Sequence, residues 1–165
     1  MPQPRKLQPF SLLLLLPAFF LMVCLSARAL DPDIYPAPDQ AKVDLTAGLK
    51  AAAAGHKRVI LDFGGNWCGD CKVLDIYFHD PANKQLLDAN YVLVHINIGR
   101  MDQNQEIAER YQIPLSKGVP ALAVLDSHGK LLYSQRTGEF EAMRRMDPGA
   151  VTSFLLQWKP TRPGM

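Results

Sequence analysis

Two cysteines, Cys68 and Cys71, stand between a run of residues typical of a buried strand and a run typical of a helix. The run before them, residues 58–63 (RVILDF), is short and apolar and contains β-branched side chains, which favours a strand. The run after them, residues 71–78 (CKVLDIYF), has apolar positions that suit a helix packed on a sheet. The sequence therefore predicts that the cysteine pair opens a helix soon after a buried strand.

The rest of the chain alternates helical and extended patterns. Residues 44–55 begin with Asp, end with Gly and contain helix formers between them. Further helices are predicted at 81–90, 104–111 and 147–158, and further strands at 91–98, 121–126 and 131–136. The chain has 165 residues, enough for one domain. The pattern predicts an α/β fold with a mixed central β-sheet flanked by helices.

The N-terminal residues have the pattern of a targeting segment. Arg5 and Lys6 precede an apolar run at 10–27, and the run ends in the small-x-small sequence Ala27-Arg28-Ala29. A positive start, a short apolar run and such an ending are typical of a secretory signal peptide, which we predict over residues 1–29. The rest of the chain is therefore expected to be exported, with the bacterial periplasm as its location.

An uncleaved membrane anchor is the alternative, because the apolar run is near the lower limit of what can cross a bilayer. Lipidation at Cys24 is disfavoured, since Val23 before it is not small. After the signal, residues 30–39 contain three prolines and are predicted to form an extended lead-in. The domain itself is predicted over residues 40–160.

Cleavage would change the charge and the cysteine count. The whole chain carries a formal charge of +2, but loss of residues 1–29 would leave 15 basic against 16 acidic side chains. This balance gives no support for binding to nucleic acid. Cys68 and Cys71 would be the two remaining thiols, and in an exported protein they would meet an oxidising environment.

The spacing of the pair suits redox chemistry. Cysteines three positions apart on a helix can close a disulfide within one turn. At the start of a helix, unpaired N–H groups and the helix dipole stabilise a thiolate, which makes Cys68 the predicted nucleophile and Cys71 the resolving thiol. Asp70 adds a negative charge between them, so its replacement by Asn is expected to favour the Cys68 thiolate.

The residues around the pair resemble the thioredoxin family. Residues 61–72 (LDFGGNWCGDCK) are similar to the family's signature, and residues 117–122 (KGVPAL) are similar to its cis-proline loop. The resemblance covers most of the predicted domain. It implies a thioredoxin fold and thiol-disulfide oxidoreductase activity, with the redox-active disulfide in place of any cofactor.

The resemblance also implies roles for individual residues. Asp62, at the end of a buried strand, would accept the proton of Cys71, because burial favours a protonated carboxyl group. Trp67 would shield one side of the disulfide. Pro120 would be the cis residue, which leaves the backbone of Val119 free to pair with an extended substrate segment.

The chain departs from the family pattern at positions that would tune the redox pair. Gly69-Asp70 replaces the usual Gly-Pro between the cysteines, and Lys72 follows them as in the family. His95 stands where the family often has a lysine near the buried aspartate. We assign redox tuning to Gly69, Asp70, Lys72 and His95.

Two other uses of the cysteines are weighed against this interpretation. A zinc site would need two more ligands, and the four histidines are scattered along the chain; covalent haem would need His at the position of Lys72. No metal site is therefore predicted. A structural disulfide over so short a loop would stabilise the chain little.

The sequence thus favours a monomeric reductase for the disulfides of exported, cysteine-containing proteins, with a membrane thiol protein as its electron donor. The alternative is a non-catalytic thioredoxin scaffold that binds a partner or carries a metal and keeps Cys68 and Cys71 as a structural disulfide.

Overall fold

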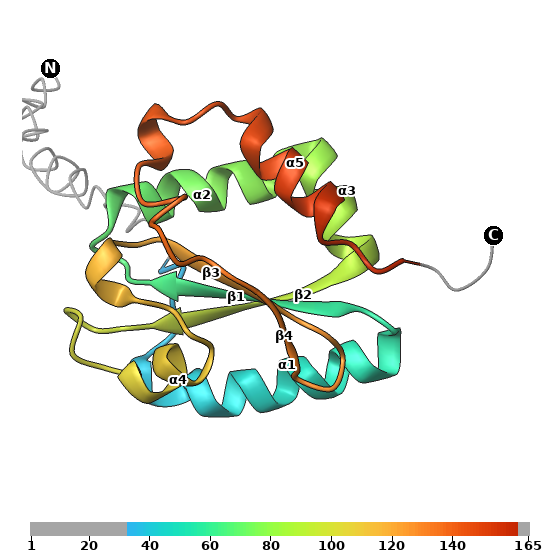
Figure 1. The fold of residues 1–165 in the computed structure, drawn as a ribbon, viewed down its shortest axis with the longest axis horizontal. Coiled ribbons are helices and arrows are strands. Elements are labelled where there is room, and N and C mark those ends of the chain that lie inside the picture. Colours follow the sequence, from blue (N-terminus) through green and yellow to red (C-terminus); the bar gives the residue numbers. More distant parts are fainter. Residues whose placement is uncertain (1–32, 162–165) are drawn as a thin grey trace, which may run out of the picture. The chain divides into compact units, whose positions relative to one another are not determined.

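The computed structural model describes residues 33–161 (Figure 1). The predicted signal segment and Cys24 lie outside them. In chain order the elements are the 3-10 helix η1 (Pro38–Gln40), α1 (Ala41–Gly55), β1 (Arg58–Gly64), α2 (Gly69–His79), α3 (Pro81–Asn90), β2 (Tyr91–Asn97), α4 (Gln105–Arg110), η2 (Leu115–Lys117), β3 (Ala121–Leu125), β4 (Leu131–Ser134), η3 (Met143–Arg145) and α5 (Gly149–Gln157). No helix among the described residues is long and apolar enough to cross a membrane.

The four strands form one mixed sheet in the order β2-β1-β3-β4. Strand β1 pairs parallel with β2 and antiparallel with β3, and β3 pairs antiparallel with β4. Because β1 is central and covered on both faces, its residues are apolar almost throughout. The register places Asp62 of β1 directly beside His95 of β2. The α/β fold class predicted from the sequence is confirmed.

Helices cover both faces of the sheet (Figure 1). Helices α1 and α4 pack on the face that contains Leu61 and Phe63 of β1. Helices α2, α3 and α5 pack on the opposite face with Ile60 and Leu122. Since successive side chains of a strand point to opposite faces, Asp62 shares the face of Ile60, which α2 covers. The fold therefore directs one buried carboxylate toward the helix that carries the cysteines.

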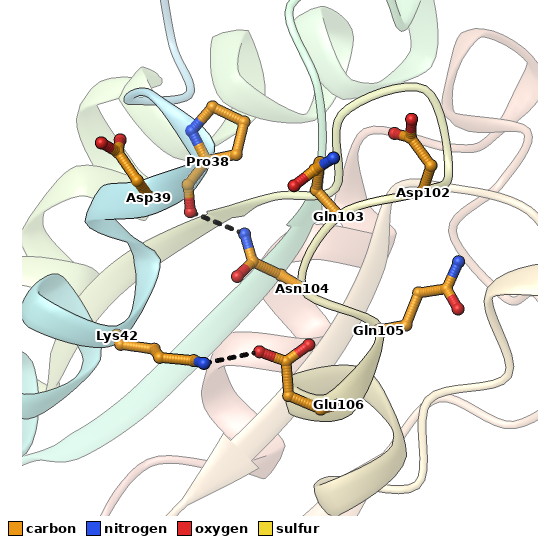
Figure 2. A pocket seen from close by; sticks show the side chains of 8 residues that line it. All are labelled: Pro38, Asp39, Lys42, Asp102, Gln103, Asn104, Gln105 and Glu106. Atoms are coloured by element: carbon orange, nitrogen blue, oxygen red, sulfur yellow. Dashed lines mark hydrogen bonds and ion pairs between the residues drawn. The ribbon is translucent and has the colours of Figure 1, made fainter.

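The segment before α1 is attached to the domain at several points. Tyr35 is 1% exposed, and its backbone N–H and carbonyl group both bond to the side chain of Asn66, each at 2.9 Å. Two amide side chains hold the residues that follow. Asn97 donates a hydrogen bond to the Pro36 carbonyl at 2.7 Å, and Asn104 donates one to the Pro38 carbonyl at 2.8 Å. Figure 2 shows the second of these contacts beside the Lys42–Glu106 ion pair.

The starts of α1 and α5 differ from those predicted, for a physical reason. The 3-10 turn η1 (Pro38–Gln40) includes residues 38 and 39 of the predicted extended lead-in and continues into α1, which begins at Ala41 and not at residue 44. Proline fits the first turn of a helix, so Pro38 can begin this turn. Helix α5 begins at Gly149, where the Asp147 side chain accepts the Gly149 N–H at 2.8 Å. The predicted Asp-Pro start thus forms a turn just outside the helix.

Candidate active site

Cys68 and Cys71 form a disulfide at the N-terminus of α2. Cys68 is the N-cap residue, and its sulfur accepts a hydrogen bond from the Cys71 N–H at 3.1 Å. The N–H of Lys72 bonds to the Cys68 carbonyl at 3.2 Å, which continues the helix. Cys68 is 5% exposed and Cys71 is fully buried. The sulfur of Cys68 is therefore the one that a partner can reach first, and it lies where a helix stabilises negative charge.

A second loop approaches the disulfide from the start of β3. The peptide bond between Val119 and Pro120 is cis. The carbonyl oxygen of Val119 lies 3.6 Å from Cys68 Sγ, although the two residues are 51 positions apart in the sequence. Gly118 precedes them with a φ of 99°, in the region that favours glycine. The predicted cis-proline loop and Cys68 thus lie side by side.

Trp67 lies at the surface immediately before the disulfide. Its side chain is 44% exposed, and Nε1 donates a hydrogen bond to the Gly99 carbonyl at 2.5 Å. The guanidinium group of Arg100 lies 6.0 Å from the centre of the indole ring. The contact between Trp67 and the loop after β2 fixes the ring at the edge of the site, with much of its apolar surface accessible to a partner.

A buried group of polar side chains lies behind Cys71. The Asp62 carboxylate accepts hydrogen bonds at Oδ2 from the Tyr35 hydroxyl at 2.8 Å and from His95 Nδ1 at 3.0 Å. The other oxygen, Oδ1, is buried and has no hydrogen-bond partner among the described residues. Asp62 is 1% exposed. This carboxylate is therefore held through one oxygen and keeps the other available as an acceptor.

The charges of this group shift the titration of its neighbours. Burial lowers the pKa of His95, but the hydrogen bond and charge of Asp62, together with the charge of Asp75, outweigh it and raise that pKa above its usual value. Burial raises the pKa of Tyr35 well above its usual value, and Asp62 and Asp75 raise it further. Tyr35 therefore keeps its proton throughout the range in which thiols titrate.

Asp70, the charged residue between the cysteines, has a partner that the sequence analysis did not identify. Arg144 donates to it from the backbone N–H at 2.9 Å, from Nε at 3.1 Å and from Nη2 at 2.8 Å. The hydrogen bond from the Arg144 side chain lowers the pKa of Asp70. The same guanidinium group lies next to Gly69, whose added β-carbon would be 3.7 Å from it. The negative charge beside Cys68 is therefore offset by a cation.

The predicted site residues gather at one end of β1. Cys68 lies beside Val119, and Asp62 lies beside His95; Asp70, Trp67 and Lys72 surround the disulfide in the adjoining loop and helix. Reasoning from sequence missed Tyr35 and Arg144. The one available signal for Tyr35 was an isolated aromatic residue among three prolines. Within residues 33–161, no three His, Cys, Asp or Glu side chains lie close enough together to hold a metal ion.

A disulfide at a helix N-terminus, next to a cis-proline and on a mixed four-stranded sheet, defines a thiol-disulfide oxidoreductase with a thioredoxin fold. The profile of the Thioredoxin-like family matches residues 40–127, and the chain belongs to this family. Thioredoxin from Rattus norvegicus is 37% identical over 104 residues, which cover 62% of this chain and 85% of that protein.

Two bacterial proteins extend the comparison. The thiol:disulfide interchange protein DsbD of Pseudomonas fluorescens is 27% identical over 122 residues, or 72% of this chain, but the chain spans only 19% of that protein's length. The crystal structure of a disulphide isomerase from Xylella fastidiosa Temecula1 superposes with a TM-score of 0.71 at 31% identity, and the match covers 75% of this chain and 95% of the other. Both matches cover about three quarters of this chain.

Proposed function

We propose that this protein reduces disulfides of exported proteins through the Cys68–Cys71 dithiol. The observation that carries the proposal is the difference between the two sulfurs: Cys68 Sγ lies beside the Val119 carbonyl at the helix N-terminus, while Cys71 is fully buried. A substrate strand that pairs with the Val119 backbone would bring its disulfide to Cys68. The reaction needs no cofactor besides the cysteine pair.

The reaction has two exchanges. The Cys68 thiolate attacks one sulfur of the substrate disulfide, and the other substrate sulfur leaves as a thiolate. Cys71 then loses its proton, for which Asp62 is the acceptor, and attacks Cys68 Sγ. The second substrate sulfur leaves, so that the substrate gains two electrons and the protein regains its disulfide. Trp67 would cover the exposed side of the reacting sulfurs.

The location and the electron donor form part of the same proposal. The signal pattern of residues 1–29 supports export, and the similarity to DsbD of Pseudomonas fluorescens supports a periplasmic protein that receives electrons from a membrane thiol protein. Gly69, Asp70, Lys72 and His95 would set the redox potential of the pair. We propose that the protein acts as a monomer on cysteine-containing substrates.

Trapping tests the order of the two exchanges. A Cys71→Ser variant should accumulate mixed disulfides on Cys68, because the resolving thiol is missing. The matched control, Cys68→Ser with Cys71→Ser, should form none, and Cys68→Ser alone should lose insulin disulfide reduction. If Cys71→Ser accumulates no mixed disulfide with exported proteins, the assignment of Cys68 as the nucleophile is wrong.

The direction of the reaction is tested by the reduction potential of the pair against glutathione. A reductase should lie near the value of thioredoxin, about −270 mV, whereas a value near about −120 mV would identify an oxidant. A potential well below about −300 mV without insulin turnover would indicate a structural disulfide. Zinc bound stoichiometrically by the reduced protein would favour the metal carrier.

A further inference from the structure

We propose that the Tyr35 hydroxyl relays the proton of Cys71 to Asp62 in the second exchange. This inference rests on the proposed function, because it concerns the step in which Cys71 resolves a mixed disulfide. Tyr35 lies before residues 40–127, the part of the chain that the family profile covers. The family match therefore assigns Tyr35 no role.

The position of the hydroxyl group carries the proposal. It donates a hydrogen bond to Asp62 Oδ2 at 2.8 Å. A β-carbon added to Gly64 would lie 2.4 Å from this hydroxyl oxygen and 2.7 Å from Cys71 Sγ. The oxygen and the sulfur thus face the same small space, no further apart than the sum of these distances. Because glycine at position 64 has no side chain, no Cβ stands between the Cys71 sulfur and the Tyr35 hydroxyl.

The hydroxyl is held in place by contacts at both ends of the residue. The two hydrogen bonds to Asn66 fix the Tyr35 backbone, and the ring stands edge-on to His95 with 5.1 Å between ring centres. Asn66 itself lies in the loop just before Cys68. Since backbone, ring and hydroxyl all contact elements of the site, the separation between the Tyr35 oxygen and Cys71 is set by the fold.

The surrounding charges decide how the proton moves. Asp62 on β1, His95 on β2 and Asp75 on α2 all act on this region, and both acidic groups disfavour the ionised form of Tyr35. The transfer is therefore concerted. The S–H bond of Cys71 breaks as its proton binds the Tyr35 oxygen, while the phenol's own proton passes to Asp62 Oδ2. The products are a Cys71 thiolate, a neutral Tyr35 and a protonated Asp62, with no change in oxidation state.

The test follows the two exchanges separately by stopped flow. Mixing the reduced protein with 5,5′-dithiobis(2-nitrobenzoate) releases one coloured thiolate when Cys68 attacks and a second when Cys71 resolves the mixed disulfide. Tyr35→Phe removes the hydroxyl and keeps the ring. It should slow the second release about tenfold and move its pH profile to higher pH, because general acid-base assistance is lost. The first release should keep its rate.

Tyr111→Phe is the matched control. Tyr111 is also buried in the core on the α1 and α4 face, but its hydroxyl has no hydrogen-bond partner among residues 33–161. Its variant should therefore leave both releases unchanged.

A double variant provides a second check. When Asp62 is already replaced by Asn, the further change Tyr35→Phe should have no effect on either release, since the relay has lost its acceptor. An equal slowing in that background would overturn the proposal.

The outcomes separate this inference from the proposed function. A wild-type protein that releases only one thiolate would overturn both. If the wild-type protein gives two releases and Tyr35→Phe matches them in rate and pH profile, only the relay is overturned.

If Tyr35→Phe does not fold, the wild-type second release is measured in mixtures of light and heavy water. A curved dependence on the deuterium fraction supports two protons in flight, and a linear one overturns the relay.

Discussion

Two carboxylates flank the disulfide, and their surroundings differ. Asp62 is 1% exposed and pairs with the mostly buried His95 at 3.0 Å. Asp70 is paired with Arg144 at 2.8 Å, but the arginine side chain is 67% exposed. Both pairs join an acidic and a basic side chain at hydrogen-bond distance. Solvent and salt screen the outer pair, whereas the inner pair lies where electrostatic interactions are strong.

Because their surroundings differ, we expect the two carboxylates to have separate roles. Asp62 lies near the end of β1 and is buried, and we propose that it accepts the proton of Cys71 there. Asp70 lies in the first turn of α2, beside the reachable sulfur of Cys68. There it changes the electrostatic surroundings of the thiolate, and Arg144 offsets that change. The inner pair should therefore control proton transfer and stability, and the outer pair should adjust reactivity.

The largest expected effect comes from Asp62→Asn. This change keeps the shape of the side chain and removes the proposed proton acceptor, so the Cys71-dependent release should slow about 100-fold. The Cys68-dependent release should change less than about twofold, because Asp62 contacts the buried side of the site. Stopped-flow measurement of both releases checks this. Equal slowing of both steps would show that Asp62 is not specific to Cys71.

His95→Gln should lower stability in a pH-dependent way. The pKa of His95 is raised in the folded protein, so the protonated ring stabilises the fold fully below the unfolded value of about 6.5. That contribution is lost as the pH rises through the folded value. Because the bond is to a charged group, the variant should lose about 1.5–3 kcal/mol of unfolding free energy at low pH and less at high pH.

Urea unfolding at about pH 5.5 and about pH 9 measures this difference. His128→Gln is the control, since His128 is an exposed turn residue and its variant should show no such trend. A loss from His95→Gln that is as large at the higher pH as at the lower would contradict the charged pairing with Asp62.

The same comparison shows what the sequence could and could not predict. The strand before the cysteines, the helix after them and Pro120 beside the site follow from local patterns and from the family signature. The contacts of Asp62 with Tyr35 and of Asp70 with Arg144 join residues 27 and 74 positions apart. No local pattern encodes them, because they arise when the lead-in and the segment after β4 pack against the loop and the helix.

Arg144→Ala should have a smaller effect, and one of a definite sign. Without the guanidinium group, the charge of Asp70 beside Cys68 is no longer offset and disfavours the thiolate. The pH midpoint of Cys68 alkylation should move upward, with a rate near neutral pH a few-fold lower, and salt should reduce the change. Iodoacetamide kinetics on the Cys71→Ser background isolate this thiol. An unchanged or lower midpoint would show that Arg144 does not act through charge.

Combining Asp70→Asn with Arg144→Ala should give the smallest effect. Asp70→Asn alone leaves an uncompensated cation and should move the alkylation midpoint downward, as the sequence already indicates. The double variant removes both charges, so the midpoint should return close to that of the wild type. If the double variant instead has the same alkylation midpoint as Asp70→Asn alone, the charge of Arg144 does not affect the Cys68 thiolate, and Arg144 only positions Asp70. That result would reduce the outer pair to a structural contact.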